Sequence, residues 1–350
     1  MSTPARLVLV QTADWDPLYR PGGFEPFVTA LAHGLADSSD VLVVGPGPLR
    51  PVYRNSGEFF SRQTLDPHSL RRTLALMSEQ GWFVAVHNLV GALIEVEGPT
   101  SLMLHGPPNT ATGLPGRMLN FESPIDLDWS ETLTEVQRHG SIAVCSAYVA
   151  AQSSKVFTTS EFDVVHPPVH PLFASVLRQE QQHDVIWVGR TTKNKGLGWL
   201  IENNEHWSFS WQWSGDEYFG DDSVAKMAKS FPSVPARRGV VEMADLFSKT
   251  RVVLCPYLGE GFGMVVAEAA ASGCRVVAFG QGGVLESGRA EHVTLVPPGD
   301  VVAFNDAVCA ALEAGTVSQG GRAHAASLYS PENSVLAYRD HLRRRLGVFE

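Results

Sequence analysis

Short apolar runs alternate with segments of helical periodicity near the start of the chain. Residues 6–11 (RLVLVQ) and 40–45 (DVLVVG) have the continuous apolar character of buried strands. Between them, apolar side chains recur at the spacing of one helix face over residues 27–35. This order of strand, helix and strand predicts an α/β fold with a parallel sheet.

The same pattern continues along the rest of the chain, with a break in the middle. The proline-rich segment 164–173 separates two such series and predicts a boundary between two domains. We place the first domain at residues 1–168 and the second at 169–330. Further strands are predicted within residues 82–88, 101–106, 141–146, 184–189, 251–257 and 275–279.

The composition is that of a globular protein. With 350 residues, the chain is long enough for two domains, each with its own core. Hydrophobic residues make up 44% and charged residues 18%, which excludes a disordered chain. The formal net charge of -10 argues against nucleic acid or an anionic membrane surface as the main partner, because both attract Lys and Arg.

The cysteines and the N-terminus bear on the redox state, the metal content and the cellular location of the protein. Cys145, Cys255, Cys274 and Cys309 have neither CxxC spacing nor the His spacing of a metal site, so we expect reduced structural cysteines and no bound metal. The first apolar run, residues 7–10, is too short for a signal peptide or a membrane span. We therefore expect a cytoplasmic protein without an integral membrane segment.

One segment carries most of the candidate chemistry. Glu260 precedes a glycine turn, and Glu268 follows eight positions later in an Ala-rich stretch that predicts a helix. The start of such a helix presents backbone N–H groups and a positive dipole end, which favour a diphosphate. The residues expected to bind a donor at this turn are Gly261, Phe262, Gly263, Met264 and Val265.

The two carboxylates suit the binding of a polyol, because each accepts two hydroxyl hydrogen bonds. With phosphates at the helix start, we expect Glu260 beside a sugar and Glu268 beside a ribose. The alternative for Glu268 is a solvent-facing side chain on a surface helix. The segment lies between the predicted strands 251–257 and 275–279, and ligands of open α/β sheets bind at such strand ends.

The ordered motifs from Val185 to Pro298 resemble family four of the retaining glycosyltransferases, and the likeness is weaker before Asp184. The matching features are a strand, Glu-Gly-Phe-Gly, a helix with Glu eight residues on, Ser-Gly, a strand, and Gly282-Gly283 followed by Glu286. The resemblance implies a GT-B fold of two facing Rossmann-like domains. It also implies a last helix, residues 331–350, that crosses back to the first domain.

A cationic loop follows the predicted strand 184–189. Arg190, Lys193 and Lys195 lie here, and a solvated turn is one interpretation. The resemblance matches Arg190 and Lys195 to residues that stabilise a departing nucleoside diphosphate, a role suited to a planar guanidinium and a compact ammonium. It assigns no role to Lys193. Val240 matches the segment that contacts the nucleotide base, before a helix predicted at residues 243–248.

The first domain supplies further candidates. Gly22 and Gly23 follow the first strand, and such a pair can be a simple turn; the resemblance implies backbone contact with the donor phosphates. His87 and His105 lie near strand ends, where histidines are more often structural. The resemblance favours His105, followed by Gly106, as the histidine that contacts the transferred sugar.

Two other groups of residues admit a structural interpretation. Four tryptophans between Trp199 and Trp213 are expected to pack in the core, although an aromatic platform for an acceptor is an alternative. A C-terminal helix is predicted from Pro331, with apolar residues Val335, Leu336, Tyr338 and Leu342. The basic residues Arg343, Arg344 and Arg345 near its end indicate a solvated helix terminus, or an anionic lipid surface.

These features predict a metal-independent retaining glycosyltransferase with a nucleotide-sugar donor, UDP before GDP, and a small-molecule or glycan acceptor. Glu260, His105, Arg190 and Lys195 are the expected catalytic residues. A nonhydrolysing sugar-nucleotide 2-epimerase and a silent nucleotide-sugar-binding partner are the alternatives, and we expect a monomer or homodimer. Departures from the family pattern at Tyr257-Leu258, Cys274-Arg275 and Leu285 leave the donor open.

Overall fold

The chain folds into two compact units in the computed structural model. Unit 1 comprises Met1–Pro168 and Pro331–Glu350, and unit 2 comprises Val169–Ser330. The residues described are 5–10, 25–46, 61–65, 67–87, 96–107, 140–155, 157, 161–215, 223–236 and 239–349.

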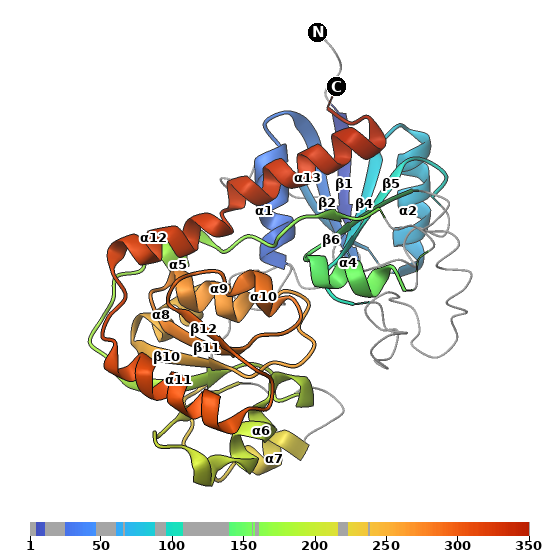
Figure 1. Ribbon diagram of the computed structural model, residues 1–350. Coiled ribbons are helices and arrows are strands. Elements are labelled where there is room, and N and C mark those ends of the chain that lie inside the picture. The colour runs from blue at the N-terminus through green and yellow to red at the C-terminus, as the bar shows by residue number, and fades with distance from the viewer. Residues whose placement is uncertain are drawn as a thin grey trace. The chain divides into compact units, whose positions relative to one another are not determined.

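Unit 1 is built on a parallel sheet of seven strands in the order β3-β2-β1-β4-β5-β6-β7 (Figure 1). The central strand β1 is buried from Leu7 to Val10, and Leu9 lies opposite Val43 on one side and Ala85 on the other. The strands are β1 (Ala5–Val10), β2 (Ser39–Pro46), β3 (Ser61–Leu65), β4 (Phe83–His87), β5 (Thr100–Leu104), β6 (Gly140–Val144) and β7 (Asp163–Val164).

Helices α1 (Glu25–Leu35), α2 (Pro67–Glu79), α4 (Ala147–Ser153) and α13 (Pro331–Leu346) complete the described part of unit 1. Helix α13 packs beside α1 (Figure 1). Its residues Val335, Tyr338 and Leu342 are buried, whereas Leu336 is 57% exposed. The predicted C-terminal helix is therefore present, and Leu336 lies on its exposed side because one helix face covers only part of each turn.

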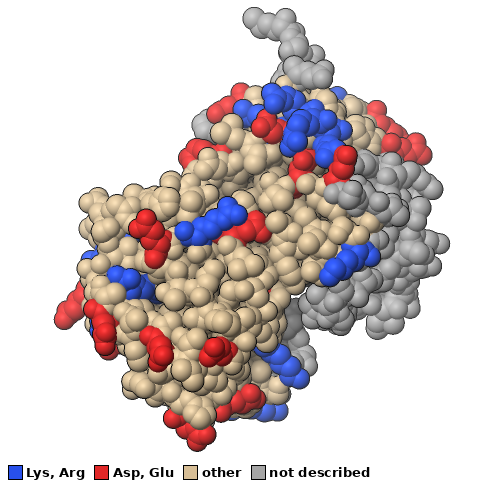
Figure 2. Space-filling view, in the orientation of Figure 1, with Lys and Arg blue, Asp and Glu red and all other residues tan. Residues whose placement is uncertain are grey.

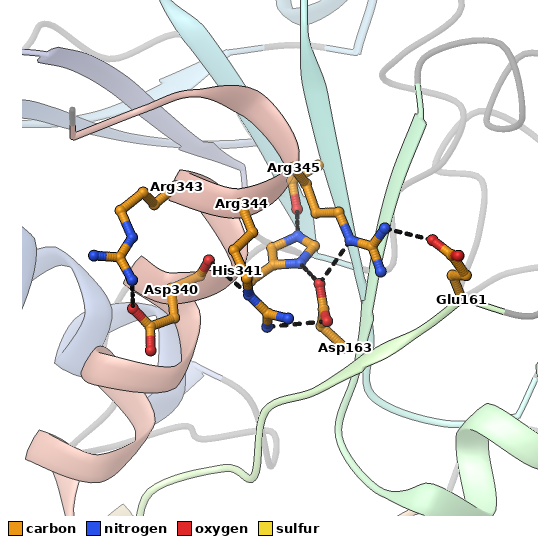
Figure 3. A network of polar contacts seen from close by, with 8 residues as sticks. Glu161, Asp163, Asp340, His341, Arg343, Arg344 and Arg345 are labelled. Carbon is orange, nitrogen blue, oxygen red and sulfur yellow. Dashed lines mark hydrogen bonds and ion pairs between the residues drawn. The ribbon is translucent and has the colours of Figure 1, made fainter.

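The basic end of α13 is ion-paired within unit 1 (Figures 2 and 3). The Arg345 guanidinium lies 2.6 Å from Glu161 and 3.1 Å from Asp163, and Arg344 lies 3.1 Å from Asp163. Arg343 pairs with Asp340 at 3.0 Å. Arg344 and Arg345 thus fix the helix end against β7, whereas Arg343 pairs within α13.

Asp163 also belongs to a buried chain of hydrogen bonds. Its carboxylate lies 2.7 Å from Nδ1 of His341, and Nε2 of His341 lies 2.8 Å from the Ser101 hydroxyl (Figure 3). This has the order of a hydrolytic triad. Ser101 and His341 are fully buried, however, so no substrate can reach the hydroxyl and the chain joins α13 to β5.

Unit 2 is built on a second parallel sheet, in the order β12-β11-β10-β8-β9. Figure 1 shows α8 and α9 on one side of this sheet and α11 on the other. The strands are β8 (His183–Val188), β9 (Gln212–Ser214), β10 (Thr250–Cys255), β11 (Arg275–Phe279) and β12 (Val293–Val296). The described helices are α5 (Pro171–Ser175), η4 (Lys193–Lys195), α6 (Leu197–Glu202), η5 (Asn204–His206), α7 (Ser223–Ala228), α8 (Gly239–Ser248), α9 (Met264–Ala271), α10 (Val284–Ser287), α11 (Val301–Glu313) and α12 (Gln319–Leu328).

The tryptophans of unit 2 pack in its core, as expected. Trp211 is 4% exposed, and Trp199, Trp207 and Trp213 pack against the same buried cluster. The Trp207 and Trp213 indoles donate hydrogen bonds to backbone carbonyls, and that of Trp211 donates to a side-chain amide oxygen. The expected strands are present, and the two sheets establish the predicted α/β class.

Two further predictions can be compared with the structure. Helix α8 begins at Gly239 and not at Met243, so Val240 lies inside the first helical turn. All four cysteines are free thiols, and all but the half-buried Cys309 are buried. Among the described residues, no helix is long and apolar enough to cross a membrane.

Candidate active site

Three loops meet at the carboxyl edge of the unit 2 sheet, after the adjacent strands β8, β10 and β11. The Leu258 N–H donates to the Asn194 carbonyl at 2.7 Å, which joins the first two loops. The Gly283 N–H donates to the Glu260 carbonyl at 2.9 Å, which joins the second and third. Backbone bonds thus hold the Glu-Gly-Phe-Gly turn in place from both sides.

Glu260 and Lys195 form the central ion pair of this edge. The Lys195 ammonium lies 2.5 Å from a Glu260 carboxylate oxygen, and the two side chains are 11% and 20% exposed. The Lys195 carbonyl accepts a hydrogen bond from the Trp187 indole at 2.9 Å, which anchors the loop to β8. The sequence predicted a phosphate-binding role for Lys195 and gave no sign of its contact with Glu260.

Tyr257 contacts the Lys195 side of this pair through its ring, and its sequence position gave it no predicted role. The Lys195 ammonium lies 4.5 Å from the centre of the Tyr257 ring. The Tyr257 hydroxyl donates to the Val188 carbonyl at 2.7 Å, and the side chain is fully buried. Burial raises the pKa of Tyr257 well above its usual value, so the phenol stays neutral. The sequence feature that could have indicated a role for Tyr257 is its position at a strand end, just before an acidic loop.

The turn before α9 and the loop that faces it each need a glycine. Gly263 has φ of 94°, and a Cβ there would lie 2.9 Å from the Ser287 hydroxyl oxygen. A Cβ on Gly283 would lie 2.0 Å from the Gly261 carbonyl oxygen, because the two loops approach closely. Phe262 is buried and packs edge-on against Tyr329 at 5.0 Å, which closes the turn.

Helix α9 begins directly after this turn. The N–H groups of Val266 and Ala267 both point to the Gly263 carbonyl, at 3.0 and 3.4 Å. Met264 and Val265 are partly buried in the first turn, where N–H groups have no acceptor within the helix itself. The predicted donor-binding residues 261–265 therefore lie together at a helix start, a position suited to an anion.

Glu268 lies in the second turn of α9 and is partly buried, not fully exposed to solvent. Burial raises its pKa to about 7, against the opposing effect of the nearby Lys195 charge. The charges of Glu260 and Glu268 both act on Tyr257. One cation, two carboxylates and a neutral phenol thus form a single electrostatic cluster beside the start of α9.

The remaining unit 2 candidates lie in the segment after β8 and in α8. Arg190 and Lys193 are exposed in the loop that follows β8. Val240 is 4% exposed, so its side chain packs in the core and only its backbone is suited to contact a base. Among the described residues, no group of three or more His, Cys, Asp or Glu is arranged to hold a metal ion.

The unit 1 candidates are two histidines in contact. Nδ1 of His87 lies 2.9 Å from Nε2 of His105, at the ends of the neighbouring strands β4 and β5. Burial lowers the pKa of His87 to about 3 and holds that of His105 well below its usual value, so both rings are neutral near pH 7. The predicted residues Gly22 and Gly23 lie outside the described residues.

Comparison with known proteins gives a partial family match and a fold. Residues 182–314 match the model of the family described as Glycosyl transferases group 1. Sucrose-phosphate synthase from Thermosynechococcus elongatus superposes with a TM-score of 0.72 at 17% identity, over 97% of this chain and 98% of that chain. A UDP-forming alpha,alpha-trehalose-phosphate synthase from Burkholderia xenovorans, in complex with glucose-6-phosphate, has a TM-score of 0.71 at 12% identity, over 97% and 99%.

A trehalose-6-phosphate structure from E. coli, bound with UDP-2-fluoro glucose, has a TM-score of 0.64 at 14% identity, over 97% and 99% of the two chains. No curated protein matches the sequence. The chain therefore has the GT-B fold of these structures, and residues 182–314 match the family model of group 1 glycosyl transferases.

Proposed function

We propose that the protein is a retaining glycosyltransferase that moves a sugar from a nucleoside diphosphate donor to an acceptor hydroxyl without a metal ion. UDP is the favoured nucleotide and GDP the second. The observation that carries the proposal is the convergence of Glu260, Lys195 and Glu268 beside the start of α9. One structure of the same fold is bound with UDP-2-fluoro glucose and another is a UDP-forming synthase, which supports the choice of UDP.

Each group of the cluster has a chemical task in this proposal. The N–H groups at the start of α9, with Lys195 and Arg190, stabilise the diphosphate as it departs with negative charge. Glu260 accepts hydrogen bonds from the transferred sugar, and Glu268 accepts them from the ribose hydroxyls. The contact with Glu260 fixes the Lys195 ammonium, so it needs no reorganisation as charge develops.

Retention follows if the acceptor attacks from the face that the diphosphate leaves. The bond from the anomeric carbon to the phosphate oxygen breaks, and a bond to the acceptor oxygen forms on the same face. The acceptor proton goes to the departing phosphate oxygen. His105, neutral because of its burial, contacts the sugar and carries no charge into this step.

A thermal-shift screen of UDP, GDP, ADP and dTDP, with their sugar conjugates and with EDTA or magnesium, tests donor binding. A ligand at a hundred times its dissociation constant adds about 2.7 kcal/mol of stability. We expect one nucleotide series to stabilise the protein in EDTA. A shift that requires magnesium would refute metal independence, and no shift with any nucleotide would refute the proposal.

The reaction product distinguishes a glycosyltransferase from an epimerase and from a silent nucleotide-sugar-binding protein. Incubation of the identified donor with candidate acceptors should give a new glycoside whose anomeric configuration equals that of the donor, as measured by NMR coupling constants. An inverted product would contradict retention. An epimerase would change the configuration of the donor sugar itself in the absence of any acceptor, and a silent binding protein would leave the donor unchanged.

A further inference from the structure

The contact between His87 and His105 has consequences for the protons of both rings. His87 ends β4, and His105 follows β5, its neighbour in the sheet. Their nitrogens are 2.9 Å apart, a hydrogen-bond distance, and the rings stack with centres 5.2 Å apart and an interplanar angle of 22°. One of the two nitrogens must therefore donate and the other accept.

The surroundings of the pair keep both rings neutral. Phe27 lies edge-on to both rings, with centres 5.6 Å from His87 and 5.3 Å from His105, and the Tyr338 ring lies 5.9 Å from His87. His87, Phe27 and Tyr338 are all buried. A neutral imidazole carries one proton, so the nitrogen that donates in this contact fixes the tautomer of both rings.

The second nitrogen of His87 decides which tautomer is present. Nε2 of His87 is buried and has no hydrogen-bond partner among the described residues. If His105 donated, the proton of His87 would lie on this Nε2 as an unpaired buried N–H. If His87 donates from Nδ1, Nε2 carries only an unpaired lone pair. Unpaired buried N–H groups are the rarer of the two in proteins, which favours donation by His87.

We propose that His87 is a positioning residue that donates from Nδ1 to Nε2 of His105 and so fixes His105 as the tautomer with its proton on Nδ1. The contact also holds the His105 ring at one angle. Because the lone pair of His105 Nε2 is occupied, that nitrogen does not accept a proton from a substrate hydroxyl. For catalysis this rests on the proposed function, in which a phosphate oxygen takes the acceptor proton and His105 positions the sugar.

Two substitutions of His87 separate the hydrogen bond from packing. In His87→Asn, the side-chain amide places an N–H donor near the position of Nδ1, whereas His87→Leu removes the donor and keeps an apolar side chain. Phe27→Leu is the matched control, because it alters the packing of both rings and leaves the two nitrogens in place. Thermal unfolding of each variant reports whether it folds.

The direct readout is the tautomer of His105 in the full-length protein, measured by long-range 1H–15N correlation of 15N-labelled imidazoles and assigned with His105→Gln. We expect the proton on Nδ1 in the wild type, in His87→Asn and in Phe27→Leu. In His87→Leu we expect a mixture of tautomers. A proton on Nε2 of His105 in the wild type, or an unchanged tautomer in His87→Leu, would overturn the proposal.

Steady-state kinetics with the identified donor give the functional readout. A lost hydrogen bond of this kind should lower kcat about fivefold in His87→Leu. We expect the donor KM to stay within about twofold and the kcat of His87→Asn to stay within about twofold of the wild type. Equal losses in His87→Leu and Phe27→Leu would show that His87 acts only through packing. If the wild type transfers no sugar, the proposed function fails, and the tautomer measurement still decides the role of His87.

Discussion

Replacing Glu268 by Gln should stabilise the unliganded protein, and the gain should grow with pH. The folded-state pKa of Glu268 is about 7, above the ordinary value of 4.5, because burial disfavours the carboxylate. Between these two values the folded state binds more protons than the unfolded state. Stability therefore falls as pH rises through this window, and Gln, which does not ionise, avoids the loss.

The size of the effect follows from the shift of the pKa. At about 1.4 kcal/mol per unit, the gain is about 0.8 kcal/mol at pH 5 and at most about 3.5 kcal/mol at pH 8. Urea unfolding of the wild type and Glu268→Gln from pH 5 to pH 8 measures it, with Glu332→Gln, at an exposed helix position, as the control. A difference that does not change with pH, or a less stable Glu268→Gln, would refute the reasoning.

The same substitution should weaken nucleotide binding. A carboxylate kept for binding would then lower the stability of the unliganded protein, a common trade-off between function and stability. In the proposed site an ionised Glu268 would accept two ribose hydrogen bonds, whereas Gln offers one acceptor and one donor group. We expect the nucleoside diphosphate to bind the wild type more tightly as pH rises from 6 to 8, since binding favours the ionised form. Titration calorimetry measures this, and a pH-independent affinity would contradict it.

Three further substitutions test the scaffold of the two units. Gly263→Ala should destabilise unit 2 by about 1–3 kcal/mol and weaken donor binding, because its φ is 94° and a Cβ would crowd Ser287; unchanged donor affinity would count against the turn as a phosphate site. Tyr257→Phe should cost about 1–2 kcal/mol in urea unfolding, since the Val188 carbonyl loses its donor; equal stability would show that the hydroxyl contributes nothing. Asp163→Asn should cost about 2 kcal/mol at pH 7 and progressively less as pH falls below the ordinary pKa of 3.8, because hydrogen bonds from His341 and Arg345 lower the pKa of the carboxyl in the folded state; a cost independent of pH would contradict this.

Local patterns predicted the elements of the structure well. The apolar runs that became β1, β8, β10 and β11 are short and bounded by polar residues, so strand identity follows from neighbours in the sequence. Helix α8 is an exception. Val240 and Val241 are β-branched and give no helical signal of their own, and the segment becomes helical because Val240 packs into the unit 2 core.

Contacts between distant segments could not be predicted from local patterns. Lys195 and Glu260 are far apart in sequence, and they meet because β8 and β10 are neighbours in the sheet. His87 and His105 meet for the same reason at the ends of β4 and β5. The sequence marked all four as candidates or alternatives, whereas their pairing depends on strand order, which no local signal determines.

The central claim is that the cluster around Glu260 binds and activates a nucleotide-sugar donor, and turnover tests it most directly. The measurement is the release of nucleoside diphosphate from a panel of donors in EDTA, by the wild type and by Glu260→Gln. We predict release from one donor series by the wild type, and a kcat/KM at least about tenfold lower in Glu260→Gln, since a charged contact to the sugar is lost. No release from any donor, or equal rates for the two proteins, would contradict the account.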